Sequence, residues 1–143
     1  MDSIKLINAV PEIFAMREDL RSDIWHSNVE FERGKKYLIR AESGTGKSSM
    51  CSYLYGSRGD YRGDILFDDK DVRDFSTRDW CHIRQRQISI LFQDLRIFGE
   101  LTAMENVLIK NRMYNTQSNQ TILGWFEQLG IPDKVNSRMD RMS

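Results

Sequence analysis

The sequence predicts an α/β fold in which a buried strand leads through a glycine-rich turn into a helix. Two apolar runs, within 36–41 and at 88–92, have the composition of strands buried on both faces of a parallel sheet. A glycine-rich turn at 41–46 follows the first run, and residues 47–55 then have helical spacing. From about residue 100 onward the apolar spacing is mostly helical. We therefore expect strands mixed with helices, followed by a helical end.

Short strand patterns dominate the amino-terminal part. Residues 4–10 are rich in branched side chains and are stopped by Pro11. Residues 23–31 and 36–41 give two more strands, separated by the turn-forming residues 32–35. Together these segments predict an antiparallel, β-rich edge of the sheet.

A helix is predicted over residues 47–55. Its spacing places Met50, Cys51 and Leu54 on one inward face, and Gly56 stands where the helix would end. Residues 63–67 are a further strand candidate.

Capping patterns mark the later helices. Ser76 and Asp79 form a capping box that opens a helix with Trp80 and Ile83 facing inward. A second box precedes the helix after residue 101, and the last helix has apolar residues at i, i+3, i+4 and i+7. These residues are Thr102 and Glu105 for the box, and Ile122, Trp125, Phe126 and Leu129 for the last helix. We expect a core over residues 1–100 and a helical subdomain over 101–143.

The composition excludes several classes of protein. The 143 residues carry 21 Lys plus Arg against 21 Asp plus Glu, which argues against a chain that wraps nucleic acid by bulk electrostatics. Cys51 and Cys81 have no CxxC spacing and indicate reduced thiols rather than a disulfide or a zinc site. No apolar run approaches the roughly 20 residues of a membrane span, and the amino terminus lacks a signal-peptide pattern. We expect an intracellular chain.

Residues 41–48 fit the phosphate-binding pattern G-x-x-x-x-G-K-[ST], with alanine in place of the first glycine. Gly44 and Gly46 permit backbone angles at which successive N–H groups converge on phosphate oxygens. Lys47 supplies a positive charge, the Ser48 hydroxyl can ligate Mg²⁺, and the following helix offers its positive end to an anion. The alternative, a structural glycine turn, is disfavoured because a strand and a helix are predicted on either side.

A second stretch, residues 88–107, strengthens this interpretation. A predicted strand ends at Gln93, a short apolar loop follows, and the sequence then runs L-T-x-x-E-N-V. This stretch resembles the glutamine loop of ABC-type ATPases, and the interval from Lys47 to Gln93 suits that family. The resemblance covers nearly the whole chain and is closest to ATP-binding subunits of the lipoprotein-release or cell-division type.

The resemblance implies the roles of individual residues. Lys47 would hold the outer phosphates of ATP, Ser48 would hold Mg²⁺, and Gln93 would contact the metal or the attacking water and sense the γ-phosphate. Phe14 would stack on adenine, with Trp25 as a poorer match and a core position as the alternative for Phe14. Backbone N–H groups would bind the α- and β-phosphates from Ser43, Gly44, Thr45, Gly46, Lys47, Ser48 and Ser49.

Several family elements do not occur in the sequence. The family's signature loop, its aspartate and glutamate after a strand, and its later histidine would follow the last helix, and Ser143 falls where the signature serine is expected. His26 and His82 precede the glutamine loop and cannot replace the histidine. We therefore expect the amino-terminal two-thirds of an ABC ATPase, with the carboxy-terminal part of the sheet missing, that binds ATP without hydrolysing it.

The resemblance also implies partners and a location. The intact protein would pair with a second ATPase domain and drive a transmembrane permease through the region around Leu95, Ile97 and Phe98, at the cytoplasmic face of the membrane. No nucleic acid partner is expected. Three alternatives remain open: a P-loop small-molecule kinase, an ATPase of chromosome maintenance or repair, and a nucleotide-sensing module without turnover. Neither the transported substrate nor the direction of transport follows from the sequence.

Overall fold

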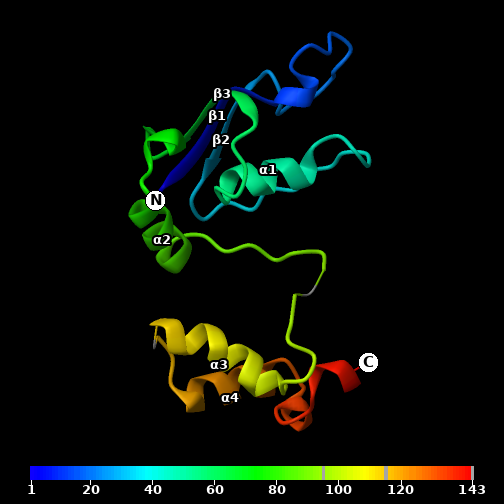
Figure 1. Ribbon diagram of the computed structural model, residues 1–143, viewed down its shortest axis with the longest axis vertical. Helices are drawn as coiled ribbons and strands as arrows, with labels where there is room; N and C mark the ends of the chain where they lie inside the picture. Colours follow the sequence, from blue (N-terminus) through cyan, green and yellow to red (C-terminus); the bar gives the residue numbers. More distant parts are fainter. Residues whose placement is uncertain (95, 115, 143) are drawn as a thin grey trace. The chain divides into compact units, whose positions relative to one another are not determined.

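The computed structural model describes residues 1–94, 96–114 and 116–142, so Leu95 and Ser143 lie outside the described residues. The chain forms two compact units, Met1–Ile90 and Leu91–Ser143 (Figure 1). The units divide at residue 90, whereas the sequence places the division at residue 100. Residues 98–101 belong to the second unit because two of their carbonyls accept hydrogen bonds from its carboxy-terminal part. The Asp140 N–H donates to the Gly99 carbonyl, and the Met139 N–H donates to the Leu101 carbonyl, both at 3.0 Å.

The first unit is built on an antiparallel sheet with strand order β2-β1-β3-β4. The strands are β1 (Ser3–Pro11), β2 (Asn28–Glu32), β3 (Tyr61–Phe67) and β4 (Lys70–Asp71). The pairing of β1 with β3 shifts register between Ile7 and Val10, where Asn8 has a φ of 48°. This irregularity interrupts the alternation of side chains, so that consecutive residues at the end of β1 are buried. The expected antiparallel edge is confirmed.

Helices α1 (Lys47–Leu54) and α2 (Thr77–Arg86) belong to the same unit as the sheet (Figure 1). The capping box of Ser76 and Asp79 opens α2 as predicted, and Ile83 is buried. Met50 and Tyr53 are the buried residues of α1, whereas Cys51 is exposed. The prediction for Cys51 is wrong because residues at i and i+3 share a helix face and the next residue after Met50 points about 100° away. Short 3₁₀ helices are Glu12–Phe14 and Val72–Asp74.

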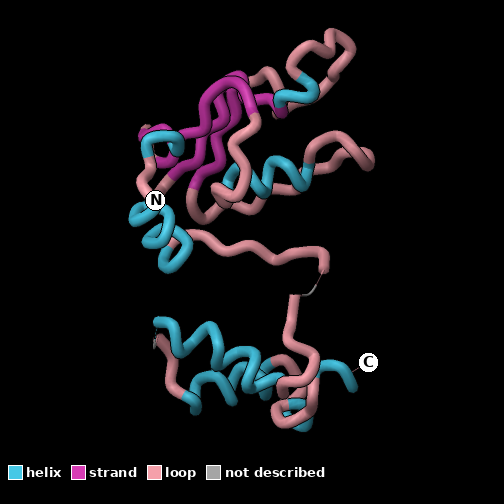
Figure 2. The backbone as a smooth tube through the Cα atoms, viewed as in Figure 1, coloured by secondary structure: helices cyan, strands magenta, loops and turns pink. Residues whose placement is uncertain are grey.

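Three strand predictions differ from the structure. Within the described residues, neither 36–41 nor 88–92 forms a strand, and Figure 2 draws both segments as loop. Leu38 is 77% exposed and Leu91 is 90% exposed, so the expected burial is also wrong. An apolar run becomes a strand only where its N–H and C=O groups pair with a neighbouring strand, and no described strand pairs with these segments. The third prediction, 23–31, is too long because β2 begins at Asn28.

The second unit contains α3 (Ala103–Tyr114), α4 (Asn119–Gln128) and the 3₁₀ helices Pro132–Lys134 and Met139–Arg141. Thr102 and Glu105 form the predicted capping box: the Thr102 N–H donates to the Glu105 carboxylate at 2.8 Å, and the Glu105 N–H donates to the Thr102 hydroxyl at 3.2 Å. The bonds that the Glu105 carboxylate accepts from the N–H and the hydroxyl of Thr102 hold the pKa of this carboxyl below its ordinary value. The small core of this unit contains Ala103, Ile122 and Phe126.

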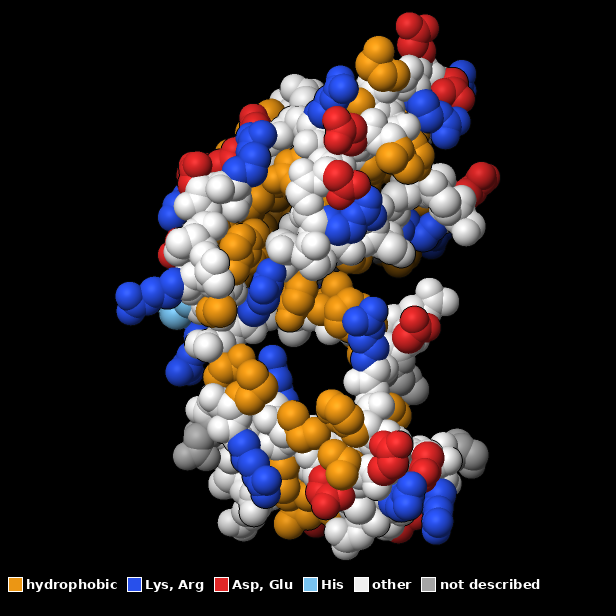
Figure 3. All heavy atoms as spheres, viewed as in Figure 1, with side chains coloured by type: hydrophobic (Ala, Val, Ile, Leu, Met, Phe, Trp, Pro, Cys, Tyr) orange, Lys and Arg blue, Asp and Glu red, His pale blue; other side chains and the backbone are white. Residues whose placement is uncertain are grey.

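Surface composition agrees with the absence of net charge. Figure 3 shows Lys and Arg side chains interspersed with Asp and Glu on the first unit, and hydrophobic side chains that reach the surface. Among the described residues, no helix has both the length and the apolar character that crossing a membrane requires.

Candidate functional site

The glycine-rich turn has the backbone geometry of an anion-binding loop. Gly44 has a φ of 80°, and Gly46, the residue that precedes α1, has φ 95° and ψ 10°. Both values lie where a side chain is disfavoured, which explains why glycine occupies these positions. The Gly46 carbonyl accepts the first helical bond from the Met50 N–H at 2.9 Å. The preceding N–H groups of α1 therefore have no partner within the helix and are available to an anion.

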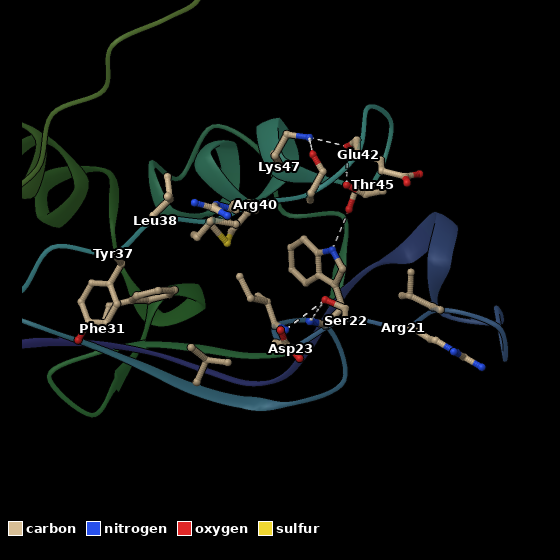
Figure 4. Close-up of a pocket in the computed structure, with 17 residues that line it drawn as sticks. Arg21, Ser22, Asp23, Phe31, Tyr37, Leu38, Arg40, Glu42, Thr45 and Lys47 are labelled. Carbon is tan, nitrogen blue, oxygen red and sulfur yellow. Dashed lines mark hydrogen bonds between the residues drawn. The ribbon is translucent and has the colours of Figure 1, made fainter.

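Lys47 is folded back over the loop that precedes it. Its ammonium donates to the Ala41 carbonyl at 2.6 Å and to the Glu42 carbonyl, to which the Thr45 hydroxyl also donates at 2.8 Å (Figure 4). The side chain is exposed, so the ammonium can exchange a carbonyl for a phosphate oxygen without first emerging from a core. The role of Lys47 toward the outer phosphates stays a prediction.

The serines of α1 differ in their surroundings. Ser48 is exposed in the first turn, and Ser43 is exposed in the loop. A hydroxyl oxygen at Ser48 fits Mg²⁺, which prefers oxygen ligands and takes few of them from protein when phosphates supply the rest. The Ser49 hydroxyl instead accepts a hydrogen bond from Arg58 at 3.0 Å. In the described part of the chain, no group of three or more His, Cys, Asp or Glu residues forms a metal site.

A cavity of about 660 Å³ lies beside the loop (Figure 4). This volume is within the roughly 300 to 1,000 Å³ that is usual for small-molecule sites. Its wall is apolar and aromatic on one part, and carries charged groups elsewhere. The lining includes Trp25, Val29, Phe31, Tyr37, Leu38, Ile39 and Met50, together with Arg21, Asp23, Arg40, Glu42, Thr45 and Lys47.

The two upstream aromatic candidates lie against Gly46. Phe14 is 8% exposed and Trp25 is 6% exposed, and both belong to the hydrophobic core of the first unit. Trp25 lines the cavity and donates its indole N–H to the Thr45 carbonyl at 3.0 Å. Phe14 packs in the core, with the Arg17 guanidinium 5.7 Å from its ring centre. The stacking role of Phe14 stays a prediction.

Side chains of α2 bind the carboxy-terminal end of α1, a contact that the sequence did not predict. Arg84 donates to the Tyr55 carbonyl at 3.1 Å and to the Gly56 carbonyl at 3.0 Å. A positive side chain is favourable there because the carboxy-terminal end of a helix carries partial negative charge. Trp80 packs so closely that a Cβ built on Gly56 would lie 2.6 Å from its ring. These contacts hold the helix that follows the phosphate loop.

The remaining predicted residues lie in the second unit. Gln93 is exposed, as are Ile97 at 42% and Phe98 at 57%. The backbone of Phe98 is clamped by Asn106, whose amide oxygen accepts from the Phe98 N–H at 2.9 Å and whose amide nitrogen donates to the Phe98 carbonyl at 3.0 Å. This clamp gives a structural reason for the asparagine in L-T-x-x-E-N-V.

Comparisons with known proteins agree with this geometry. The family model described as "ABC transporter" matches residues 25–143. An uncharacterised ABC transporter ATP-binding protein of Mycobacterium tuberculosis is 24% identical over 133 residues, which cover 91% of this chain and 54% of that protein. The ABC transporter ATP-binding protein YclH of Bacillus subtilis is 29% identical over 110 residues, 75% of this chain and 47% of YclH. The chain thus spans about half the length of these curated relatives.

A solved structure establishes the fold. The ATP-binding cassette MJ0796, solved as a dimer bound to ADP and phosphate, aligns with a TM-score of 0.74 at 22% identity. The alignment covers 98% of this chain and 63% of the cassette. The aligned residues therefore have the fold of an ATP-binding cassette.

Proposed function

Because this chain belongs to the ABC transporter family, we propose that it binds MgATP through residues 41–49 as part of the ATP-binding subunit of a membrane transporter. One observation carries this proposal. Gly44 and Gly46 have left-handed backbone angles just before the amino-terminal end of α1, and the exposed Lys47 of that end lines a cavity of about 660 Å³. A loop with this geometry concentrates N–H donors and positive charge, which is the requirement for binding a polyphosphate.

Each group in the loop has a defined task in this proposal. The N–H groups from Ser43 to Ser49 would bind the α- and β-phosphates, and Lys47 would move from the Ala41 and Glu42 carbonyls to the outer phosphates. The Ser48 hydroxyl would hold Mg²⁺, which neutralises phosphate charge when bound. Gln93 would contact the metal or the attacking water, the role that the family resemblance implies. Binding therefore replaces bonds from the Lys47 ammonium to neutral carbonyls by bonds to negatively charged phosphate oxygens.

The partners belong to the same proposal. In the intact subunit, ATP would be held between two ATPase domains, and the exposed side chains of Ile97 and Phe98 would contact a transmembrane permease. Exposed apolar side chains in one loop favour a protein partner over solvent. The proposed place of action is the cytoplasmic face of a membrane, through that permease.

Titration calorimetry of the chain with ATP and Mg²⁺ tests the binding site. Lys47→Ala removes the ammonium and should weaken binding by on the order of 2 to 5 kcal/mol, the cost of truncating one partner of a charged hydrogen-bonded pair. Lys36→Ala is the matched control, because Lys36 is exposed and is not among the described residues that line the cavity. Equal ATP affinity in the Lys47→Ala variant and the parent would refute the site.

A further inference from the structure

Trp25 is a buried donor that reaches the phosphate loop across 20 residues of sequence. Its indole N–H donates to the Thr45 carbonyl at 3.0 Å, and the residue is 6% exposed. The backbone around it is also held. The Ser22 hydroxyl accepts from the Trp25 N–H at 3.0 Å, and the next residue, His26, donates its N–H to the Ala9 carbonyl of β1 at 3.1 Å. The indole is thus anchored to the sheet.

The geometry of the peptide group gives this hydrogen bond a consequence for the loop. The Thr45 carbonyl and the Gly46 N–H belong to one planar trans peptide group, in which C=O and N–H point in opposite directions. A donor that fixes the carbonyl on the Trp25 side therefore directs the Gly46 N–H away from Trp25. Without that donor, the peptide group loses a restraint on its rotation.

Packing adds a second restraint at the same place. A Cβ built on Gly46 would lie 3.1 Å from Cζ2 and 3.2 Å from Nε1 of Trp25, and 3.4 Å from Cε2 of Phe14. The ring therefore forms a close wall behind Gly46. The wall and the hydrogen bond act on neighbouring atoms of the loop, and both come from one side chain.

We infer that Trp25 is a positioning residue for phosphate binding, which fixes the Thr45–Gly46 peptide so that the Gly46 N–H faces the bound polyphosphate. The ligand class is any di- or triphosphate, because the contact acts on the loop and not on a base. This inference rests on the proposed function. It also assigns Trp25 a task other than stacking on adenine.

Trp25→Phe tests the inference, since it keeps an aromatic ring in the core and removes the N–H donor. Affinities for MgATP and for inorganic pyrophosphate are measured by calorimetry, at a temperature well below the melting transition of each variant. Both affinities should fall by the same factor, roughly threefold to tenfold, which is the range for losing one buried hydrogen bond. The control is Trp125→Phe, which makes the same change in a half-exposed ring of α4, outside the unit that carries the loop. It should leave both affinities unchanged.

A spectroscopic measurement keeps Trp25 itself in place. The chain has three tryptophans, so Trp80→Phe combined with Trp125→Phe leaves Trp25 as the sole indole emitter. Pyrophosphate should then shift its emission, and Lys47→Ala in that background should abolish the shift.

The outcomes separate the two proposals. If the parent binds neither ligand, the proposed function fails and this inference fails with it. If Lys47→Ala abolishes binding but Trp25→Phe binds both ligands like the parent, the positioning role alone is overturned. A loss confined to ATP, with pyrophosphate binding unchanged, would also overturn it, since Trp25 would then act on the nucleoside.

Discussion

Replacing Gly46 by alanine should destabilise the chain more than the same change at Gly44. Gly46 has a φ of 95° and Gly44 a φ of 80°, so alanine pays backbone strain of about 1 to 2 kcal/mol at either position. The surroundings differ. A Cβ at Gly46 would lie 3.1 Å from Trp25, whereas a Cβ at Gly44 meets no described atom within 4 Å. The comparison therefore measures the effect of the side chains behind Gly46, of which Trp25 is the nearest.

The extra cost at Gly46 follows from what must move. Trp25 is buried and its indole N–H is bonded to Thr45, the residue next to Gly46, so retreat of the ring lengthens that bond. Weakening one hydrogen bond costs about 0.5 to 1.5 kcal/mol. Adding strain and this loss, Gly46→Ala should lower the free energy of unfolding by roughly 1.5 to 3.5 kcal/mol, against about 1 to 2 kcal/mol for Gly44→Ala.

Urea unfolding followed by circular dichroism measures both variants. A double-mutant cycle with Trp25→Phe completes the test, because phenylalanine lacks the Cζ2 and Nε1 atoms that crowd position 46. In the Trp25→Phe background, the excess cost of Gly46→Ala over Gly44→Ala should disappear. Equal losses in the two glycine variants, or an excess that persists without the indole, would show that the Trp25 wall does not constrain the loop.

Three further predictions concern the sheet, its acid stability and the exposed loop. Gly63→Ala should lower the free energy of unfolding in urea by roughly 2 to 5 kcal/mol, because a Cβ would lie 2.3 Å from the Asn8 carbonyl oxygen of β1. Gly34 has the same φ of 79° and no described atom within 4 Å of a Cβ, so Gly34→Ala should lower it only by the backbone strain. Backbone N–H groups of Ser3 and Asp2 lower the pKa of Asp68, so its stabilisation is complete above the unfolded value of about 3.9 and is lost as pH falls through the folded pKa. In Asp68→Asn, the free energy of unfolding should fall less steeply between about pH 6 and pH 2 than in the parent. An unchanged pH dependence would contradict this prediction. Phe98→Ala should change the free energy of unfolding by no more than about 0.5 kcal/mol, since the residue is 57% exposed. A much larger loss of stability would mean that Phe98 packs within the second unit instead of offering a docking surface.

Local patterns in the sequence predicted local structure well. Both capping boxes are present, and the helix predicted over 47–55 begins at Lys47 and ends at Leu54. Strands were predicted at 4–10 and 63–67, where β1 and β3 are found. These elements are recognisable because the residues that define them are neighbours in the chain: a cap binds an N–H three residues later, and glycine marks a turn by its own φ.

Strand pairing was predicted less well, and residues 36–41 and 88–92 explain why. Their apolar composition predicts burial on two faces, but burial also requires a neighbouring strand that supplies hydrogen bonds. In the part of the chain that the structure describes, the sheet contains β1 to β4 only, and Leu38 and Leu91 are exposed. The composition of a segment indicates whether it could form a buried strand. Whether a neighbouring strand lies beside it depends on the fold of the rest of the chain.

The contacts that sequence reasoning missed share a kind of acceptor. Trp25 donates to the Thr45 carbonyl, and Arg84 donates to the Tyr55 carbonyl 29 residues away. Every residue carries a backbone carbonyl, so the acceptor leaves no trace in the sequence, and the donor alone resembles an ordinary core tryptophan or surface arginine. The motif predicts which groups would face a phosphate, because their chemistry is specific. The groups that hold the loop from behind bind carbonyls that any sequence would provide, and only the folded chain brings them together.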